Sequence, residues 1–198
     1  MPVLVEPAIP EGSFAGVDQP VIEVSRSVAL RPWDGGDAAA VMEAFQDPLI
    51  QRWHVRRADS VEEAAGWIER WQSEWHKESG AHWAVVDASS NLLLGRIALK
   101  SIDLYDGAAD LAYWTVASAR GYGVCSGSVI ALARWAFGDM TFNRLELEHS
   151  VDNAASCRVA DRAGFQYEGT RRRSARHADG WHDMHVHSLL SREFLSQD

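Results

Sequence analysis

Seven consecutive residues have the composition of an anion-binding loop. They are Arg120, Gly121, Tyr122, Gly123, Val124, Cys125 and Ser126. The two glycines allow a phosphate to approach the backbone, and a helix that begins near Gly123 would present unpaired N–H groups and the positive end of its dipole. Two glycines before a helix also form an ordinary tight turn, so the motif alone leaves both interpretations open.

Histidine residues near the C-terminus suggest a second kind of chemistry. His182, His185 and His187 occur with Asp183. On a strand, Asp183, His185 and His187 would share one face, where a metal could be held. An alternating polar row at a sheet edge accounts for the same spacing. We therefore expect no metal, and a histidine-based metalloenzyme is kept only as an alternative.

The two cysteines, Cys125 and Cys157, predict neither a disulfide framework nor a zinc site, because they belong to no CxxC pair and to no metal-like cluster. Residues 1–11 carry acidic rather than basic groups, and no apolar run approaches the roughly 18 residues of a membrane span. We expect a cytoplasmic protein without a membrane partner.

The net charge of −9 over 198 residues opposes binding to nucleic acid, which requires a basic face. A cationic partner such as an amine suits the acidic balance better. Basic residues nevertheless gather in the C-terminal third, where they could form a positive field for an anionic cofactor or simply a solvated face. They are Arg158, Arg162, Arg171, Arg172, Arg173 and Arg176.

The elements that must position these residues form one mixed α+β domain. Four prolines and two glycines interrupt residues 1–26, which we interpret as an N-terminal arm or linker before a domain of residues 27–195. Apolar periodicity predicts strands at 27–31, 81–87, 92–101, 108–116, 144–150, 165–172 and 181–190, and helices at 34–44, 60–77, 123–138 and 153–164.

The predicted helix at 60–77 has the clearest pattern. Ser60 and Glu63 form a capping box, and apolar residues follow at intervals of three and four, which predicts a helix packed against the core. Trp53 instead lies in a short irregular stretch after Asp47-Pro48. We expect this aromatic side chain to line a pocket and to contact substrate.

Several short motifs are distributed along the chain. The main run contains Asn153-Ala154-Ala155-Ser156, Arg158-Val159, Ala163-Gly164-Phe165 and Glu168-Gly169, and earlier members are Leu30-Arg31, Asp47-Pro48 and Tyr113-Trp114. Together they resemble the RimJ/RimL-like branch of the GNAT superfamily of N-acetyltransferases, over residues 27–194. The resemblance implies a GNAT fold: a mixed, mostly antiparallel seven-stranded sheet with flanking helices, in which the parallel strands 108–116 and 144–150 splay apart.

The resemblance also implies acetyl-CoA, or another acyl-CoA, as co-substrate. Its pyrophosphate would rest on backbone N–H groups of residues 121–126, with Arg120 as the leading basic residue. Thr115 and Val116 would form strand-like hydrogen bonds to pantetheine, and Asn153 would contact it from the second helix. A backbone N–H near Val116 would stabilise the developing oxyanion.

Three departures from the family pattern are present: the local changes at Ala112 and Gly127-Ser128, and two that bear on the site. Cys125 replaces the usual Gly or Ala, and we expect it to be a buried structural thiol. Many members use a helical Tyr seven residues after the Asn as general acid, and Ala160 stands at that position. Ser156 lies four residues earlier on the same helical face, and we predict that it donates a hydrogen bond or proton to the leaving sulfur. A helical Ser can also bond to its own backbone.

The expected reaction needs a base, because an alkylammonium at pH 7 has no lone pair with which to attack. The candidates are Asp110, Glu148 and His149, and histidine has the most suitable ordinary pKa, about 6.5. Asp183 matches an acidic family position, which we assign to the substrate site. A strand-end histidine without catalytic duty, and a chain of waters as base, remain alternatives.

These interpretations predict direct transfer of an acetyl or other short acyl group from acyl-CoA to a primary amine within a ternary complex. A small molecule and a protein N-terminus are both retained as acceptors, and a homodimer is one of the assemblies left open. The alternative is a non-catalytic acyl-CoA sensor or assembly module, which would bind CoA but release no thiol with any amine.

Overall fold

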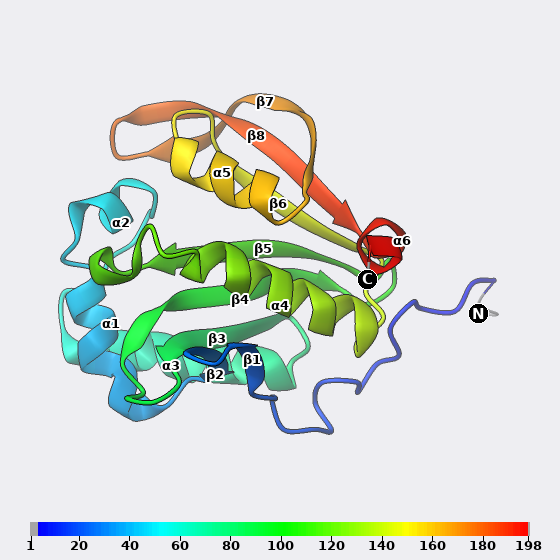
Figure 1. Ribbon diagram of the computed structural model, residues 1–198, viewed down its shortest axis with the longest axis horizontal. Helices are drawn as coiled ribbons and strands as arrows, with labels where there is room; N and C mark the ends of the chain where they lie inside the picture. The colour runs from blue at the N-terminus through cyan, green and yellow to red at the C-terminus, as the bar shows by residue number, and fades with distance from the viewer. Residues whose placement is uncertain (1–3, 198) are drawn as a thin grey trace.

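The computed structural model describes residues 4–197, which form one sheet flanked by helices (Figure 1). The strands are β1 (Ile22–Ser25), β2 (Val28–Pro32), β3 (Gly80–Asp87), β4 (Leu93–Asp103), β5 (Ala108–Thr115), β6 (Arg144–Ser150), β7 (Gln166–His177) and β8 (Gly180–Leu190). The helices are α1 (Ala38–Ala44), α2 (Pro48–Arg52), α3 (Val61–His76), α4 (Val124–Gly138), α5 (Ala154–Arg162) and α6 (Ser191–Phe194), with short 3-10 turns at Gly35–Asp37, Ala117–Ala119 and Leu195–Gln197.

Over the described residues the sheet contains eight strands in the order β1-β2-β3-β4-β5-β6-β8-β7. Neighbouring strands are antiparallel except β5 and β6, which run parallel. Their pairing joins only residues 108–110 to residues 144–146. Beyond these residues the two strands diverge (Figure 1). The mostly antiparallel sheet with one splayed parallel pair is confirmed.

One strand more than predicted belongs to the sheet. The seven predicted strands are all present, and β1 lies inside the segment that was interpreted as an arm or linker. Ile22 pairs with Leu30 and Glu23 pairs with Ala29. Residues 22–25 alternate between apolar and polar, but the prolines and glycines that precede them led the whole segment to be interpreted as an arm.

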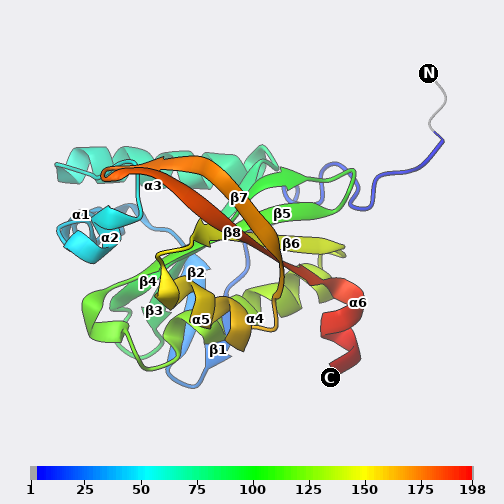
Figure 2. The ribbon, with the colours of Figure 1, turned by 90° about the horizontal axis from the view of Figure 1, so that it is seen from above.

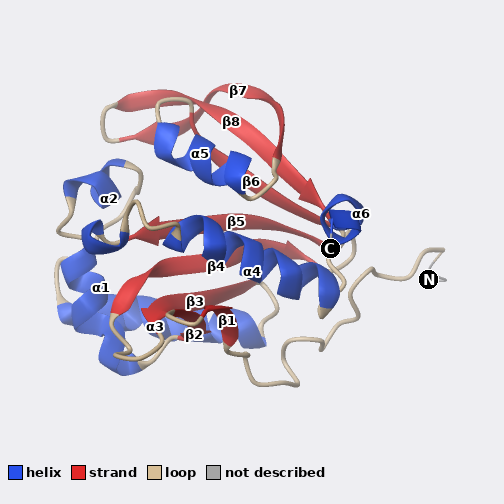
Figure 3. Ribbon diagram, viewed as in Figure 1, coloured by secondary structure: helices blue, strands red, loops and turns tan. Residues whose placement is uncertain are grey.

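Helices cover both faces of the sheet. Figure 2 shows α3 on one face and α4 with α5 on the other, and Figure 3 shows the same layers by element type. The central strand β3 is accordingly buried on both faces: Val85 packs into one core cluster, and its neighbours Ala84 and Val86 pack into another. The sheet therefore separates two apolar layers.

Helix α3 confirms the pattern read from the sequence. Ser60 accepts a hydrogen bond from the backbone N–H of Glu63 at 3.2 Å, and Ala64, Ile68 and Trp75 are buried. The apolar stripe therefore faces the core. Across residues 4–197, none of the helices combines the length and apolar character needed to span a membrane.

The segment before β1 packs into the core. Ile9 and Phe14 are 1% and 0% exposed, and the Phe14 ring meets the Trp75 ring edge-on with 5.0 Å between centroids. The Glu78 carboxylate holds the segment by accepting hydrogen bonds from the backbone N–H groups of Gly12 at 2.7 Å and Phe14 at 2.8 Å. The segment expected to be an arm or linker thus supplies core residues.

We expect Phe14→Ala to lower the free energy of unfolding by about 3–5 kcal/mol, because a fully buried ring is lost. Val17, in the same segment, is 54% exposed. Val17→Ala is therefore the control, with an expected change within about 0.5 kcal/mol. Urea unfolding followed by tryptophan fluorescence measures both variants. Equally small effects would show that the segment does not stabilise the domain in solution.

Candidate active site

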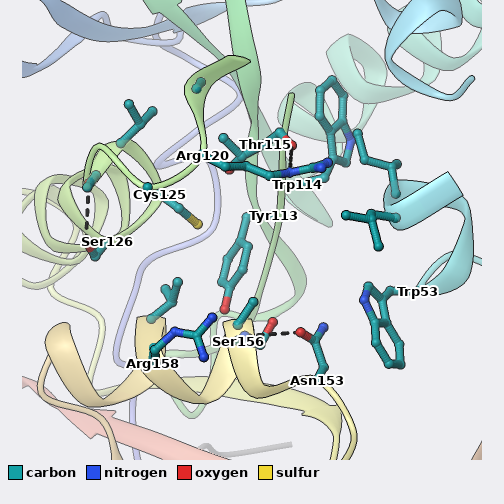
Figure 4. A pocket seen from close by; sticks show the side chains of 18 of the residues that line it. Trp53, Tyr113, Trp114, Thr115, Arg120, Cys125, Ser126, Asn153, Ser156 and Arg158 are labelled. Atoms are coloured by element: carbon teal, nitrogen blue, oxygen red, sulfur yellow. Dashed lines mark hydrogen bonds between the residues drawn. The ribbon is translucent and has the colours of Figure 1, made fainter. Parts of the chain in front are cut away.

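A cavity of about 390 Å³ opens at the end of β5, between the first turns of α4 and α5 (Figure 4). We name it the α4–α5 cavity. Its lining contains most of the residues that the sequence analysis assigned to cofactor or substrate: Trp53, Thr115, Arg120, Gly121, Gly123, Val124, Cys125, Ser126, Asn153 and Ser156. The fold thus brings together segments that are far apart in the chain.

The loop before α4 has the shape of an anion cradle. Gly121 and Gly123 have φ angles of +84° and +77°, a region that favours glycine. Gly123 is the N-cap of α4 and makes no side-chain cap, so the first N–H groups of the helix are left for a ligand. Tyr122 is 82% exposed and its side chain does not line the cavity. Only the backbone of Tyr122 can contribute to anion binding.

Arg120 ties this loop to two other elements. Its guanidinium donates to Asp47 at 2.5 Å, and its Nε donates to the carbonyl of Thr115 at 3.1 Å. Asp47 also caps α2 by accepting from the N–H of Leu49 at 2.8 Å. This five-residue helix was not predicted, because it is too short to show a helical period. Trp53 lies at its C-terminal end and reaches the cavity.

Two arginines of α5, Arg158 and Arg162, also line the α4–α5 cavity. Both belong to the basic group that was considered as a positive field for an anionic cofactor. The other four members of that group do not line this cavity. Within this cavity, Arg158 and Arg162 add to the positive field of the α4 N-terminus, while the charge of Arg120 is paired with Asp47.

The hydroxyl groups of Tyr113 and Ser156 both lie beside the first turn of α5. Asn153 caps the helix by accepting from the N–H of Ser156 at 3.2 Å, and Ser156 is 8% exposed. Figure 4 shows Tyr113 pointing from β5 toward Ser156. Burial raises the pKa of Tyr113 far above its ordinary value, so the phenol stays protonated and can act as a donor. The sequence analysis used Tyr113 only as a family motif and did not assign it to the site.

The backbone groups that β5 offers to a ligand belong to Tyr113 and Thr115. The N–H of Val116 donates to the carbonyl of Leu94 at 2.9 Å and continues the pairing with β4. Successive residues of a strand direct their N–H groups to opposite sides, so Tyr113 and Thr115 direct theirs toward the gap between β5 and β6. The sequence analysis expected Val116 to bind pantetheine and placed the oxyanion donor near it. Its N–H cannot serve either purpose, because it is already paired with Leu94.

Cys125 lines the cavity from the first turn of α4. Burial raises the pKa of its thiol to about 12, while the nearby Thr115 hydroxyl acts in the opposite direction. The thiol is therefore neutral at pH 7, when a thiolate would be required for nucleophilic chemistry. Cys125 is only partly buried and borders the cavity, so its structural role stays a prediction.

A second cavity, of about 350 Å³, contains two of the predicted bases, Asp110 and Glu148. Asp110 pairs in register with Glu146, and alternate residues of a strand share one face, so Asp110 and Glu148 project to the same face of the sheet. The side chains of Tyr113 and Thr115 alternate with them and face the α4–α5 cavity. We name the cavity that contains Asp110 and Glu148 the acidic cavity, although Lys100 and Arg171 also line it.

Glu148 is held in place within the acidic cavity. Its carboxylate accepts hydrogen bonds from Arg171 at 3.2 Å and from the Ser174 hydroxyl at 3.0 Å. These contacts come from β7, on the far side of β8 in the sheet. They give the carboxylate a defined orientation toward the space that it shares with Asp110.

His149 and Asp183 line neither cavity. His149 is 5% exposed, and its Nδ1 lies 2.8 Å from the carbonyl of Ser150. Burial lowers the pKa of His149. Asp183 accepts from the backbone N–H of Arg173 at 2.7 Å, where β7 is irregular. The structure thus separates these two residues from the other predicted site residues.

Comparison with known proteins identifies the family. Residues 27–166 match the family model described as an acetyltransferase (GNAT) domain. The chain belongs to the GNAT acetyltransferase family. The proteins that it resembles over most of their length are N-acetyltransferases, and the chain is an enzyme of this kind.

Two relatives of this GNAT chain come from Bacillus subtilis. "Putative ribosomal N-acetyltransferase YdaF" is 29% identical over 180 residues, covering 87% of this chain and 96% of the relative. "Probable N-acetyltransferase YjcK" is 25% identical over 174 residues, covering 84% of this chain and 95% of the relative. The alignments therefore extend well beyond the loop motifs.

Solved structures confirm the fold of the RimJ/RimL-like branch. RimL, a ribosomal L7/L12 alpha-N-protein acetyltransferase in complex with coenzyme A, has a TM-score of 0.82 and 22% identity, covering 86% of this chain and 98% of RimL. RimJ of Mycobacterium smegmatis, in complex with CoA-disulfide, has a TM-score of 0.79 and 17% identity, covering 88% and 89%.

The GNAT domain also contains a hydrogen-bonded chain that the sequence analysis missed. His182 Nε2 lies 2.8 Å from the Asp179 carboxylate, and His182 Nδ1 lies 2.7 Å from Ser150 Oγ. In a neutral ring that donates to Asp179, Nδ1 must accept from Ser150. The Trp53 ring lies 6.2 Å from the His182 ring, between centroids. The sequence analysis considered His182 only as a metal ligand. It could not have found this hydrogen-bonded chain, because Trp53 and Ser150 are far from Asp179 and His182 in the sequence.

In this GNAT enzyme we expect Gly123→Val to weaken coenzyme A binding roughly tenfold to a hundredfold, because valine disfavours the positive φ that shapes the cradle. Gly12 has a φ of +87° and lines neither cavity, so Gly12→Val is a control of comparable strain. Calorimetric titration with coenzyme A measures both affinities, and circular dichroism checks the fold. Unchanged affinity in a folded Gly123→Val protein would remove the phosphate-cradle assignment.

Proposed function

We propose that the enzyme transfers an acetyl group from acetyl-CoA to a primary amine while both substrates are bound. The observation that carries this proposal is the position of two cavities on opposite faces of the sheet, at the place where β5 and β6 separate. A donor in the α4–α5 cavity and an amine in the acidic cavity would meet in the gap between the strands. Holding two reactants in this way is a large source of rate acceleration.

The α4–α5 cavity suits coenzyme A. Its pyrophosphate would accept hydrogen bonds from the N–H groups of residues 121–126, and Arg158 and Arg162 would balance its charge. The pantetheine arm would pair with the exposed backbone of Thr115 as an added strand does. Asn153 uses its side-chain oxygen to cap α5, which leaves its amide NH2 group as the donor to pantetheine.

In the proposed reaction the amine nitrogen attacks the thioester carbonyl carbon, and the C–S bond breaks as the amide forms. The N–H group of Tyr113 that faces the gap would stabilise the developing oxyanion. Ser156, beside the protonated Tyr113, would donate a hydrogen bond to the departing thiolate, which then takes its proton from solvent. This pair of hydroxyls would replace the helical tyrosine that is absent at Ala160.

Glu148 is the group best supported as acceptor of the amine proton. It shares the acidic cavity with Asp110, and two carboxylates would attract the ammonium form of the substrate before one of them takes its proton. The ordinary pKa of histidine favoured His149 at the level of sequence. Because His149 lines neither cavity, we assign it no part in this step.

A protein N-terminus is the acceptor class that we favour. YdaF and RimL carry names that refer to ribosomal proteins or protein N-termini. The chemistry agrees, because an α-amino group has an ordinary pKa of about 8 whereas a lysine amine has one of about 10.4. A larger fraction of the α-amino group is neutral at pH 7, so a carboxylate is a sufficient base.

The deciding experiment is calorimetric titration with acetyl-CoA and free CoA, followed by a thiol-release assay with N-terminal peptides and small amines. We expect saturable binding and thiol release that depends on the peptide amine. Binding without release from any amine would support the sensor function instead. The absence of binding would overturn the proposal.

Ser156→Ala and Tyr113→Phe each remove one hydroxyl group with little change of shape. We expect either change to lower kcat roughly tenfold to a hundredfold and to leave acetyl-CoA affinity within about twofold. Tyr105 is 53% exposed and lines neither cavity, so Tyr105→Phe is the control. Steady-state thiol release and calorimetry separate the two effects. Unchanged turnover in Ser156→Ala would leave Ser156 with a structural role only.

Glu148→Gln is expected to lower kcat/KM for the amine roughly a hundredfold without changing acetyl-CoA affinity. The defect should shrink as pH rises, because more of the amine then binds in its neutral form. Glu146 lies on the same face of β6 but pairs with Arg144 at 2.7 Å and lines neither cavity. Glu146→Gln is therefore the matched control, and equal losses in both variants would contradict a proton-transfer role for Glu148.

A further inference from the structure

Three side chains with metal-binding atoms meet behind α5, away from both cavities. They are His149 of β6, Cys157 of α5 and His185 of β8, and their ligand atoms all lie within 4.8 Å of one another. Cys157 Sγ lies 3.7 Å from His185 Nδ1. His149 and His185 are direct partners in the β6–β8 pairing, so their side chains share the sheet face that α5 covers.

We propose that His149, Cys157 and His185 form a site for a zinc ion. Two imidazoles and one thiolate are a donor set that zinc prefers over the oxygen ligands of magnesium and calcium. With zinc bonds of about 2.0 Å to nitrogen and 2.3 Å to sulfur, tetrahedral geometry places the two ligand atoms roughly 3.5 Å apart. Cys157 Sγ and His185 Nδ1 are 3.7 Å apart, so a small side-chain adjustment would bring both onto the ion.

The His149 ring is oriented like a metal ligand, because one ring nitrogen is hydrogen-bonded to the backbone and the other is left for the ion. A carbonyl oxygen only accepts, so the 2.8 Å contact makes Nδ1 the donor to the Ser150 carbonyl. In the neutral ring Nε2 then carries a lone pair, and this buried atom has no hydrogen-bond partner within residues 4–197. Histidines that bind metals commonly donate their second N–H to a backbone carbonyl in this manner. A zinc ion would use the remaining lone pair of His149.

A fourth side chain beside the proposed site, His187, also has buried ring nitrogens without hydrogen-bond partners in the described part of the chain. His187, next on the same face of β8, stacks on the His149 ring with 5.1 Å between centroids. Unpaired buried polar atoms are uncommon in folded proteins. The fourth position of the ion would be filled by water.

The histidine row of β8 alone could not have indicated this site. The spacing of His182, His185 and His187 suggested ligands from one strand, and the fold directs His182 instead to Ser150 and Asp179. Only His185 of that row meets the two ligands that come from β6 and α5. The proposed ion would bridge three elements and hold α5, with Asn153 and Ser156, against the sheet. It takes no part in acetyl transfer, and this inference does not depend on the proposed function.

The first test uses the wild-type protein without an affinity tag. Zinc titration against a chelating indicator should show one equivalent bound, and cobalt substitution should give the near-ultraviolet charge-transfer band of a cobalt–thiolate bond. Acetyl-CoA should not displace the ion. Zinc should also protect Cys157 from alkylation by iodoacetamide, as mapped by mass spectrometry. A cobalt complex without the thiolate band, or no protection of Cys157, would overturn the proposal.

Variants provide the second test. Cys157→Ser should abolish the cobalt–thiolate band and weaken zinc binding by more than about tenfold, and His185→Asn should weaken it similarly. Cys125→Ser removes the other cysteine and should leave the band and the zinc affinity unchanged. Circular dichroism confirms that the variants at Cys157 and His185 are folded. Equal zinc affinity in wild type, Cys157→Ser and His185→Asn would show an adventitious ion only and refute the site.

Discussion

The short parallel contact between β5 and β6 is the constraint on which the rest of the structure depends. Pairing ends after residues 108–110 and 144–146, and the backbone groups that β5 directs toward β6 beyond this point have no strand partner. Backbone N–H and C=O groups must be satisfied when they are buried. Arg120 satisfies the carbonyl of Thr115, and the N–H groups of Tyr113 and Thr115 face the gap between the strands. The interrupted sheet is therefore a surface for an extended ligand.

Side chains alternate between the two faces of β5 and β6, so the groups suited to an anion and the carboxylates lie on opposite faces of the sheet. One face carries the N-terminus of α4 with Arg158 and Arg162, and the other carries Asp110 and Glu148. A protein with a net charge of −9 can therefore still attract an anion locally, because helix termini and nearby arginines dominate the field at short range. The overall charge favours a cationic partner on the opposite face.

Helix α5 connects the two groups of functional residues. Its first turn presents Asn153 and Ser156 to the α4–α5 cavity, and the next residue, Cys157, faces the histidines of β6 and β8. Consecutive helical residues point in directions about 100° apart, so a nine-residue helix can serve both sides. Whatever holds the rear of α5 also sets the position of Ser156.

Local signals in the sequence determined most of the elements and the anion cradle. The Ser60 cap, the glycines at 121 and 123 and the alternation along β6 each act over a few residues, so a linear pattern records them. The five-residue α2 was missed because it contains little more than one helical turn, and the four-residue β1 was missed because it follows a segment interrupted by prolines and glycines. Only the tertiary structure decided that Asp110 and Glu148 line one cavity, that His149 lies near Cys157 and that the N–H of Val116 is already paired. These outcomes depend on strand register and on which strands become neighbours, and both are set by packing of the whole sheet.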